Sequence, residues 1–113
     1  MYNALEIAKV IINLHYERKL MIDVYRLQLL LYLVHKKFYE ITGKLLVKNQ
    51  FLESECGPMV LEVSELFDTG DRECIKKQSA AHVDKFSLCL TQSIIMPQFI
   101  CKTNQELSSL VME

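Results

Sequence analysis

The segment from Val24 to Thr42 (VYRLQLLLYLVHKKFYEIT) constrains the fold of this chain more than any other feature. It includes six consecutive apolar residues. Its apolar positions also recur at helical spacing: Leu27, Leu30, Val34, Phe38 and Ile41. A helix that is apolar around most of its circumference is usually buried on several sides. We therefore predict a buried central helix over residues 24–42, capped by Asp23 and ended by a left-handed Gly43.

Length, composition and charge indicate one helical domain over residues 1–113. Half of the 113 residues are hydrophobic and 24% are charged, which is typical of a globular protein with one core. Only three glycines and two prolines are present, which argues against a turn-rich β-sandwich. The net charge of -1 gives no general attraction for nucleic acid or for an anionic membrane, so neither is expected as a partner. With no signal peptide and no membrane-spanning stretch visible, we expect a cytoplasmic protein.

Capping signals predict a helix on the N-terminal side of the central one. Asn3 and Glu6 have capping-box spacing, which predicts a helix at about residues 4–18. Its solvated stripe would consist of Glu6, Lys9, Asn13 and Glu17. In the connection that follows, Leu20 and Ile22 are expected to tuck into the core.

A change of pattern after Gly43 predicts a less regular region. Residues 44–48 and 50–55 are expected to form either a short two-stranded ribbon or an extended loop before the Gly57-Pro58 turn. Pro58 would then open another helix, because its missing N–H is unpaired at the first helical position anyway. That helix would bury Met59 or Val60 together with Val63, Leu66 and Phe67.

The C-terminal third carries two further helical signals. An apolar pattern begins at Val83, and Pro97 should end or kink it because proline removes a backbone donor. Its apolar positions are Phe86, Leu90, Ile94 and Ile95. Thr103 and Glu106 form a second capping box, which opens a last short helix. The predicted fold is a mainly α, single-domain helical bundle around the central helix.

The sequence lacks the motifs of common enzymes and cofactor-binding proteins. It has no phosphate-binding loop, nucleophile elbow or zinc-hydrolase motif, and its four cysteines form no close pair that would indicate zinc. We predict a protein that is not an enzyme and holds neither cofactor nor metal. A small thiol enzyme is one alternative, since Cys56 precedes a predicted helix start that would lower its pKa. A DNA-binding autorepressor is another, although the central helix is too apolar to serve as a recognition helix.

Four acidic side chains form the predicted partner-binding surface: Glu53, Glu55, Glu62 and Glu65. They are expected on a polar loop and on the exposed face of the helix that Pro58 opens. Acidic residues at such places are usually only solvated, but they also suit a basic protein partner.

Four motifs follow one another in the order of a known family. They are Leu27-Gln28-Leu29-Leu30-Leu31-Tyr32, Thr42-Gly43, Gly57-Pro58-Met59-Val60 and Glu106-Leu107-Ser108. In these motifs the chain resembles the Panacea domain, also called the SocA-like antitoxin or phage-associated protein domain. It differs from the family at Leu29, where lysine is usual, and at Ser54 and Cys56, where aromatic residues are usual. Its end at Glu113 corresponds to a short or truncated member.

The resemblance implies a helical protein that binds another protein. Family members are similar to antitoxins that neutralise a toxin by direct contact, and one branch also delivers its toxin to an ATP-dependent protease. A phage or mobile-element accessory protein that binds a host protein is the alternative. The motif positions are expected to be mostly architectural: Leu27, Gln28, Tyr32, Gly43, Gly57, Pro58, Glu106 and Leu107. In particular, Gln28 and Tyr32 are expected to bind backbone groups of the Gly57-Pro58 loop.

Overall fold

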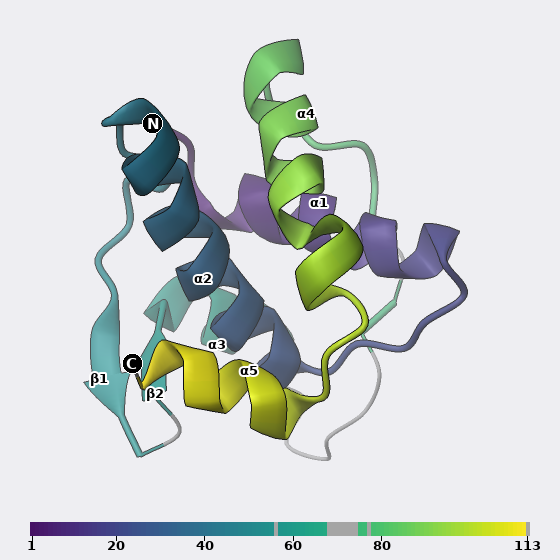
Figure 1. Ribbon diagram of the computed structural model, residues 1–113, viewed down its shortest axis with the longest axis vertical. Helices are drawn as coiled ribbons and strands as arrows, with labels where there is room; N and C mark the ends of the chain where they lie inside the picture. The colour runs from purple at the N-terminus through teal and green to yellow at the C-terminus, as the bar shows by residue number, and fades with distance from the viewer. Residues whose placement is uncertain (56, 68–74, 77, 113) are drawn as a thin grey trace.

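Helix α2 (Val24–Thr42) occupies the centre of the molecule, and the other elements pack around it (Figure 1). The computed structural model describes residues 1–55, 57–67, 75–76 and 78–112. The other elements within these ranges are α1 (Ala4–Glu17), β1 (Leu52–Ser54), β2 (Gly57–Met59), α3 (Leu61–Phe67), α4 (Lys85–Ile94), the π-helical turn η1 (Ile95–Phe99) and α5 (Asn104–Val111). This mainly helical domain with one short hairpin confirms the predicted fold class.

Both ends of α2 are set by the predicted caps. The side chain of Asp23 accepts a hydrogen bond from the backbone N–H of Arg26 at 2.8 Å. At the other end Gly43 has a φ of 72°, and its N–H donates to the carbonyl oxygen of Tyr39 at 2.8 Å. A left-handed residue is most easily supplied by glycine, which lacks the Cβ that would clash. The predicted bounds of 24–42 are therefore confirmed.

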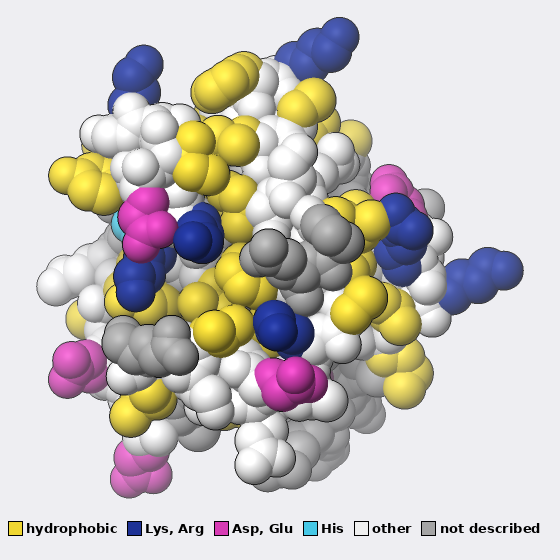
Figure 2. Space-filling model, viewed as in Figure 1, with side chains coloured by type: hydrophobic (Ala, Val, Ile, Leu, Met, Phe, Trp, Pro, Cys, Tyr) yellow, Lys and Arg dark blue, Asp and Glu magenta, His cyan; other side chains and the backbone are white. Residues whose placement is uncertain are grey.

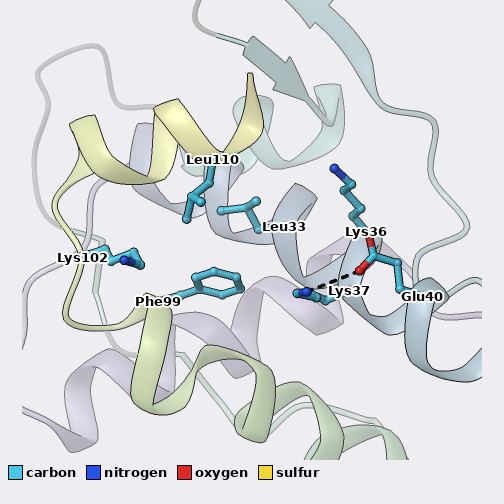
Figure 3. A pocket seen from close by; sticks show the side chains of 7 residues that line it. All are labelled: Leu33, Lys36, Lys37, Glu40, Phe99, Lys102 and Leu110. Carbon is cyan, nitrogen blue, oxygen red and sulfur yellow. Dashed lines mark ion pairs between the residues drawn. The ribbon is translucent and has the colours of Figure 1, made fainter. Parts of the chain in front are cut away.

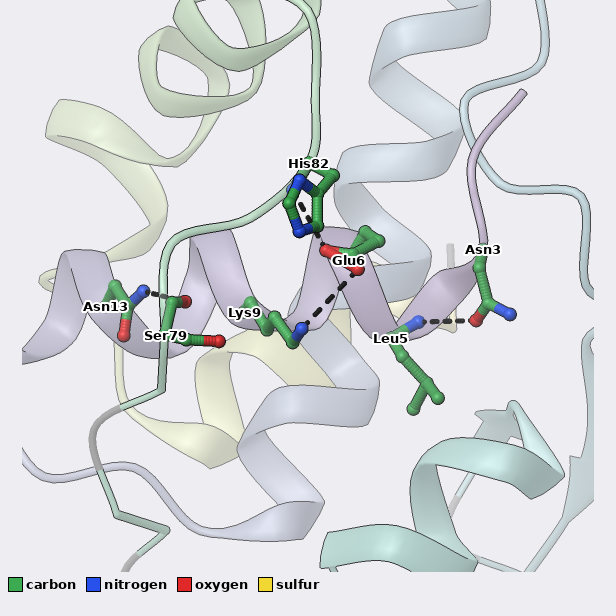
Figure 4. Close-up of polar contacts among 7 residues, drawn as sticks. All are labelled: Asn3, Leu5, Glu6, Lys9, Asn13, Ser79 and His82. Atoms are coloured by element: carbon green, nitrogen blue, oxygen red, sulfur yellow. Dashed lines mark hydrogen bonds and ion pairs between the residues drawn. The ribbon is translucent and has the colours of Figure 1, made fainter.

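Helix α1 begins at the predicted place, but without the predicted capping box. The side chain of Asn3 accepts from the backbone N–H of Leu5 at 2.9 Å. Glu6 does not bind back to Asn3; its carboxylate accepts from the backbone N–H of His82 at 3.0 Å instead (Figure 4). The predicted box is wrong because a backbone segment far along the sequence takes the Glu6 side chain.

That segment, residues 78–84, has no regular secondary structure and lies along α1 (Figure 4). The amide of Asn13 accepts from the N–H of Gln78 at 2.9 Å and donates to the carbonyl of Ser79 at 3.1 Å. A chain without a ladder must pair its backbone groups elsewhere. Glu6, Lys9 and Asn13, which were predicted to be solvated, are consequently half-buried.

Backbone contacts also join segments near α1 that are distant in the sequence. The N–H of Ile75 donates to the carbonyl of Ile22 at 2.8 Å, and both side chains are buried. Leu20 is exposed, so of the two residues predicted to enter the core, Leu20 and Ile22, only Ile22 does. Residues 44–48 do not form a ribbon strand; Val47 makes an isolated parallel bridge to Tyr2.

The hairpin includes the Gly-Pro motif, which corrects one prediction. Strands β1 and β2 are antiparallel, and Pro58 lies in β2 opposite Glu53. Helix α3 starts later, at Leu61, and the carbonyl of Val60 accepts from the N–H groups of its first turn. Pro58 therefore does not occupy the first helical position. The segment stays extended up to Val60 because α2 binds its backbone, as shown below.

The C-terminal elements follow the predicted breaks. The side chain of Asp84 caps α4 by accepting from the N–H of Ser87 at 3.1 Å. Met96 has extended angles (φ −97°, ψ 141°) directly before Pro97, as steric contact with a following proline favours. Thr103 and Glu106 form the complete capping box of α5, and they bind each other's backbone N–H at 3.1 and 3.2 Å.

Candidate functional site

A groove runs along the second half of α2, between this helix and α4, and ends at α5. It consists of three neighbouring hollows of about 640, 330 and 770 Å³. The first two share Lys37, Glu40 and Phe99 as lining residues, and the last two share Ile41. We call these three adjoining hollows together the α2/α4 groove. On the same face, Figure 2 shows hydrophobic side chains in a band from the top to the centre, with basic side chains beside it.

The groove is lined by both apolar and charged side chains, and several of the apolar ones face solvent. Its exposed large apolar side chains are Met1, Ile41, Leu45 and Phe86. Ile41 is 59% exposed and Phe86 is 66% exposed, although their spacing predicted that both would be buried. The prediction fails because α4 turns its small polar residues Ser87 and Thr91 inward, which leaves Phe86 outside. The last turn of α2 and the first turn of α4 therefore present apolar surface to water.

Lysines surround the end of the groove near α5 (Figure 3). Leu33, Phe99 and Leu110 form the apolar part of a hollow there, which is lined also by the charged residues Lys36, Lys37, Glu40 and Lys102. Lys37 pairs with Glu40 at 3.4 Å, and both are about half exposed. Among the described residues, neither Lys36 nor Lys102 has an ion-pair partner. This hollow therefore combines an apolar wall with excess positive charge.

The wall that closes the groove at α5 is fixed by a buried arginine. Arg26 is only 8% exposed, and its guanidinium donates to four groups of the connection between η1 and α5. They are the carbonyl oxygens of Phe99 (3.3 Å), Ile100 (3.0 Å) and Lys102 (2.6 Å) and the amide oxygen of Asn104 (3.2 Å). Carbonyls at the end of a helix lack intrahelical donors, and an arginine fork supplies several at once. Arg26 thereby ties α2 to the C-terminal elements.

The fifth bond of Arg26 fixes a buried histidine. Nε of Arg26 donates to Nε2 of His15 at 3.0 Å, and Nδ1 of His15 lies 2.8 Å from the carbonyl of Ile11. The two contacts require a neutral ring with its proton on Nδ1. Burial lowers the pKa of His15, and the Arg26 cation lowers it further, while the bond to Ile11 acts in the opposite direction. Burial likewise lowers the pKa of Arg26.

The apolar pattern of residues 24–42 did not predict this role of Arg26. One signal was present in the sequence. Arg26 stands inside a leucine-rich helix, and its nearest acidic residue, Asp23, is needed as the helix cap. A basic residue at a core position without a free acid predicts backbone carbonyls as partners.

Gln28 binds the Gly-Pro segment as the sequence predicted. Its Nε2 donates to the carbonyl of Val60 at 3.1 Å, and its Oε1 accepts from the N–H of Val60 at 3.0 Å. Both groups are buried, so this amide pairing satisfies polar atoms that water cannot reach. It also explains why the chain remains extended until Val60.

Tyr32 has a different role from the one predicted for it. Its ring meets the ring of Phe51 edge-on, with centroids 5.5 Å apart. His35 lies against the same Phe51 ring at 5.1 Å, and its Nδ1 accepts from the N–H of Val47 at 3.3 Å. Burial lowers the pKa of His35. Tyr32 thus packs the segment before the hairpin instead of binding the Gly-Pro loop.

The other motif positions are spread over the molecule. Leu27 and Leu107 are fully buried, whereas Glu106 is used in the cap of α5. Gly43 ends α2, and Gly57 has a φ of 107° in the hairpin. With Gln28 and Tyr25, Gly57 and Pro58 line a separate hollow of about 390 Å³. Every described motif position therefore has a visible architectural contact.

The acidic residues predicted as a partner surface are all exposed. Glu53 and Glu55 belong to the hairpin, and Glu62 and Glu65 lie one turn apart on α3. None of the four lines the α2/α4 groove, so the structure offers two separate surfaces of opposite charge.

The candidate thiol lies outside the described residues, as does Cys74. Cys89 and Cys101 are free and exposed. Within the part of the chain that the structure describes, no three His, Cys, Asp or Glu side chains are placed to hold a metal ion. Nor does any helix in these ranges have the length and apolar character needed to cross a membrane.

Comparison with known proteins finds no matching family model, no matching curated protein and no matching solved structure.

Proposed function

We propose that this protein is a non-enzymatic protein-binding module and that the α2/α4 groove is its principal binding surface. The observation that carries the proposal is the groove itself, which presents exposed apolar side chains beside lysines along α2 and α4. Four large apolar side chains in one such feature are costly to leave in water, and exposed patches of this kind usually mark interaction sites.

The class of partner follows from the resemblance to the Panacea domain. The proposed partner is a toxin that the protein neutralises by direct contact in the cytoplasm, with delivery to an ATP-dependent protease as a further step. A host protein bound by a phage or mobile-element accessory protein is the alternative. Charge complementarity at the acidic surface of Glu53, Glu55, Glu62 and Glu65 would add orientation to such a complex.

Capture from the native host, followed by a growth assay, tests this function. The full chain is used to isolate stoichiometric partners, each partner is expressed alone, and growth is compared with and without the chain. A partner that arrests growth alone and is harmless when co-expressed supports a neutraliser. A partner that is harmless alone supports the accessory protein, and the lack of any stoichiometric partner contradicts both.

Matched variants then test the surface. Ile41→Ser removes an exposed apolar side chain from the groove, whereas Tyr39→Ser removes one from the same helix outside it. We expect Ile41→Ser to weaken partner binding at least about tenfold, as the loss of about 1.4 kcal/mol would, and Tyr39→Ser to leave it within about twofold. Reversing Glu62 and Glu65 tests the acidic surface. If only that reversal weakens binding, the groove is not the principal surface.

A further inference from the structure

We infer that the α2/α4 groove accepts an amphipathic α-helix of a partner protein whose flanks carry acidic side chains. This inference deepens the proposed function, on which it rests, by naming the chemistry of the bound segment. It stands on three observations: the spacing of the walls, the open form of the groove and its charge.

The residues that line the two walls of the groove recur every four positions, which is the spacing of a ridge on a helix surface. On α2 the ridge consists of Leu33, Lys37 and Ile41, each four residues after the last. On α4 the ridge consists of Phe86, Leu90 and Ile94, at the same spacing. Ridges of this kind accept the side chains of a third helix between them. At a rise of 1.5 Å per residue, the α2 wall from Leu33 to Ile41 is about 12 Å long, which suits two to three turns of a bound helix.

The apolar part of the lining favours a helix over an extended segment. An extended chain would turn unpaired N–H and C=O groups toward leucine, isoleucine and phenylalanine side chains, which leaves polar groups without partners. A helix pairs its own backbone and presents only side chains. A small ligand fits less well, because such ligands are usually enclosed on most sides, and here Ile41 and Phe86 are exposed by more than half.

The lysines that line the α2/α4 groove favour a bound helix that carries acidic side chains. Four lysines line the three hollows: Lys36, Lys37, Lys44 and Lys102. The acidic lining residues are Glu40 and Asp84, and both are engaged, Glu40 with Lys37 and Asp84 as the cap of α4. The groove is therefore basic on a chain whose net charge is -1. Acidic residues on either side of an apolar helix stripe would meet these lysines.

A designed peptide tests the inference directly. The probe is a helical peptide of about 14 residues with leucines at i, i+3 and i+7 and glutamates beside them. It is titrated into the full isotope-labelled chain while the backbone amide signals are followed by NMR. We expect shifts confined to the residues around the groove: residues 1–2, the second half of α2 with residues 44–46, α4, residues 99–102 and the last turn of α5. A peptide with lysines in place of the glutamates should bind at least about tenfold more weakly.

Charge variants provide the matched control. Lys36→Glu together with Lys102→Glu should weaken the peptide at least about tenfold, because both lysines line the groove. Lys48→Glu together with Lys76→Glu makes the same change of charge at exposed lysines outside it, and should leave affinity within about twofold. Equal weakening in both double variants would show general charge attraction and would overturn the inference.

Other occupants are distinct outcomes of the same experiment. Shifts in the groove that appear on raising the concentration of the chain alone would identify a second copy, whose α3 exposes Leu61 and Leu66 beside Glu62 and Glu65. Binding of oleate or of anionic vesicles that is tighter than binding of the acidic peptide would identify a lipid as the occupant of the groove. Either result overturns the inference.

The natural partner separates failure of the inference from failure of the function. If that partner binds, but groove variants do not weaken it, the inference fails and the binding function stands. If no partner exists, the binding function fails, whatever the peptide does.

Discussion

The two halves of α2 place polar side chains in the same leucine-rich helix and use them in opposite ways. In the first half, Arg26 and Gln28 are buried and bind backbone groups of distant segments. In the second half, Lys36, Lys37 and Glu40 are exposed and line a groove in which the apolar side chain of Ile41 also faces solvent. The first half therefore holds the fold together, and the second half presents a surface.

The difference teaches where polar residues can be buried in this fold. A buried polar side chain is stable only when it finds partners, and the first half of α2 finds carbonyl and N–H groups that would otherwise lack them. Near the second half, α4 diverges from α2 toward the top of the view (Figure 1), and the α2/α4 groove lies between them. We therefore expect substitutions in the first half of α2 to lower the stability of the protein, and substitutions in the second half to weaken binding with little effect on stability.

Arg26→Met should have the largest effect on stability. Methionine fills much of the volume but leaves the carbonyls of Ile100 and Lys102 and Nε2 of His15 without this donor. The carbonyl of Phe99, by contrast, keeps the N–H of Lys102 at 3.1 Å. Since each buried group without a partner costs about 1–3 kcal/mol, we expect the free energy of unfolding to fall by at least about 3 kcal/mol. Urea unfolding followed by circular dichroism measures it.

Arg26→Lys is the companion variant. It keeps the positive charge but cannot reproduce the planar fork that reaches several carbonyls, so an intermediate loss is expected. If both variants are as stable as the natural chain, the arginine does not hold the C-terminal elements, and the contrast between the halves of α2 is wrong.

Gln28→Leu should have the next largest effect. It leaves the N–H of Val60 unpaired in the core, while the carbonyl of Val60 keeps its bonds to the first turn of α3. We expect a loss of about 2 kcal/mol, together with faster hydrogen exchange of the Val60 amide. Unchanged exchange at Val60 would show that another group replaces the glutamine.

The sequence predicts the parts of this fold that depend on local contacts. The ends of α2 follow from Asp23 and Gly43, and the start of α5 follows from Thr103 and Glu106, because each cap binds backbone within a few residues. The break before Pro97 is local as well. For the same reason, the central helix could be placed from its pattern alone.

The wrong predictions depend on contacts between distant residues. Pro58 would suit a helix start, but Gln28, on another helix, binds Val60 and keeps the segment extended. Glu6 would suit a capping box, but the backbone of His82 takes its carboxylate. The groove was missed because it depends on which face of α4 turns inward, and Phe86 and Ser87 offer neighbouring alternatives. No local signal indicates the bond of Gln28 either; it was expected, together with one of Tyr32 that does not form, from the resemblance alone.

Mild acid should destabilise the protein through its buried histidines. The folded state lowers the pKa of His15 and of His35, chiefly by burial, while both titrate near 6.5 in an unfolded chain. At mildly acidic pH, the two histidines therefore bind protons in the unfolded state that they do not bind in the folded state. Stability should be constant above about pH 7 and fall below about pH 6.5, by up to about 1.4 kcal/mol per pH unit for each histidine.

Urea unfolding between about pH 5 and pH 8 measures this slope, above the range in which carboxylates titrate. His35→Gln separates the two rings, because the slope that remains in this variant belongs to His15. If stability instead rises as the pH falls, the protonated ring is accommodated, and the bond between His15 and Arg26 is not required by the fold.

Lys37→Glu should have the smallest effect on stability, although it changes the groove. It replaces the ion pair between Lys37 and Glu40 by two like charges on neighbouring turns. Because both side chains are half exposed, we expect a loss of less than about 0.5 kcal/mol, reduced further by added salt. A loss above about 1 kcal/mol, measured like that of Arg26→Met, would show that the second half of α2 also holds the fold. A small loss together with weakened peptide binding would place the stabilising and binding roles in different halves of one helix.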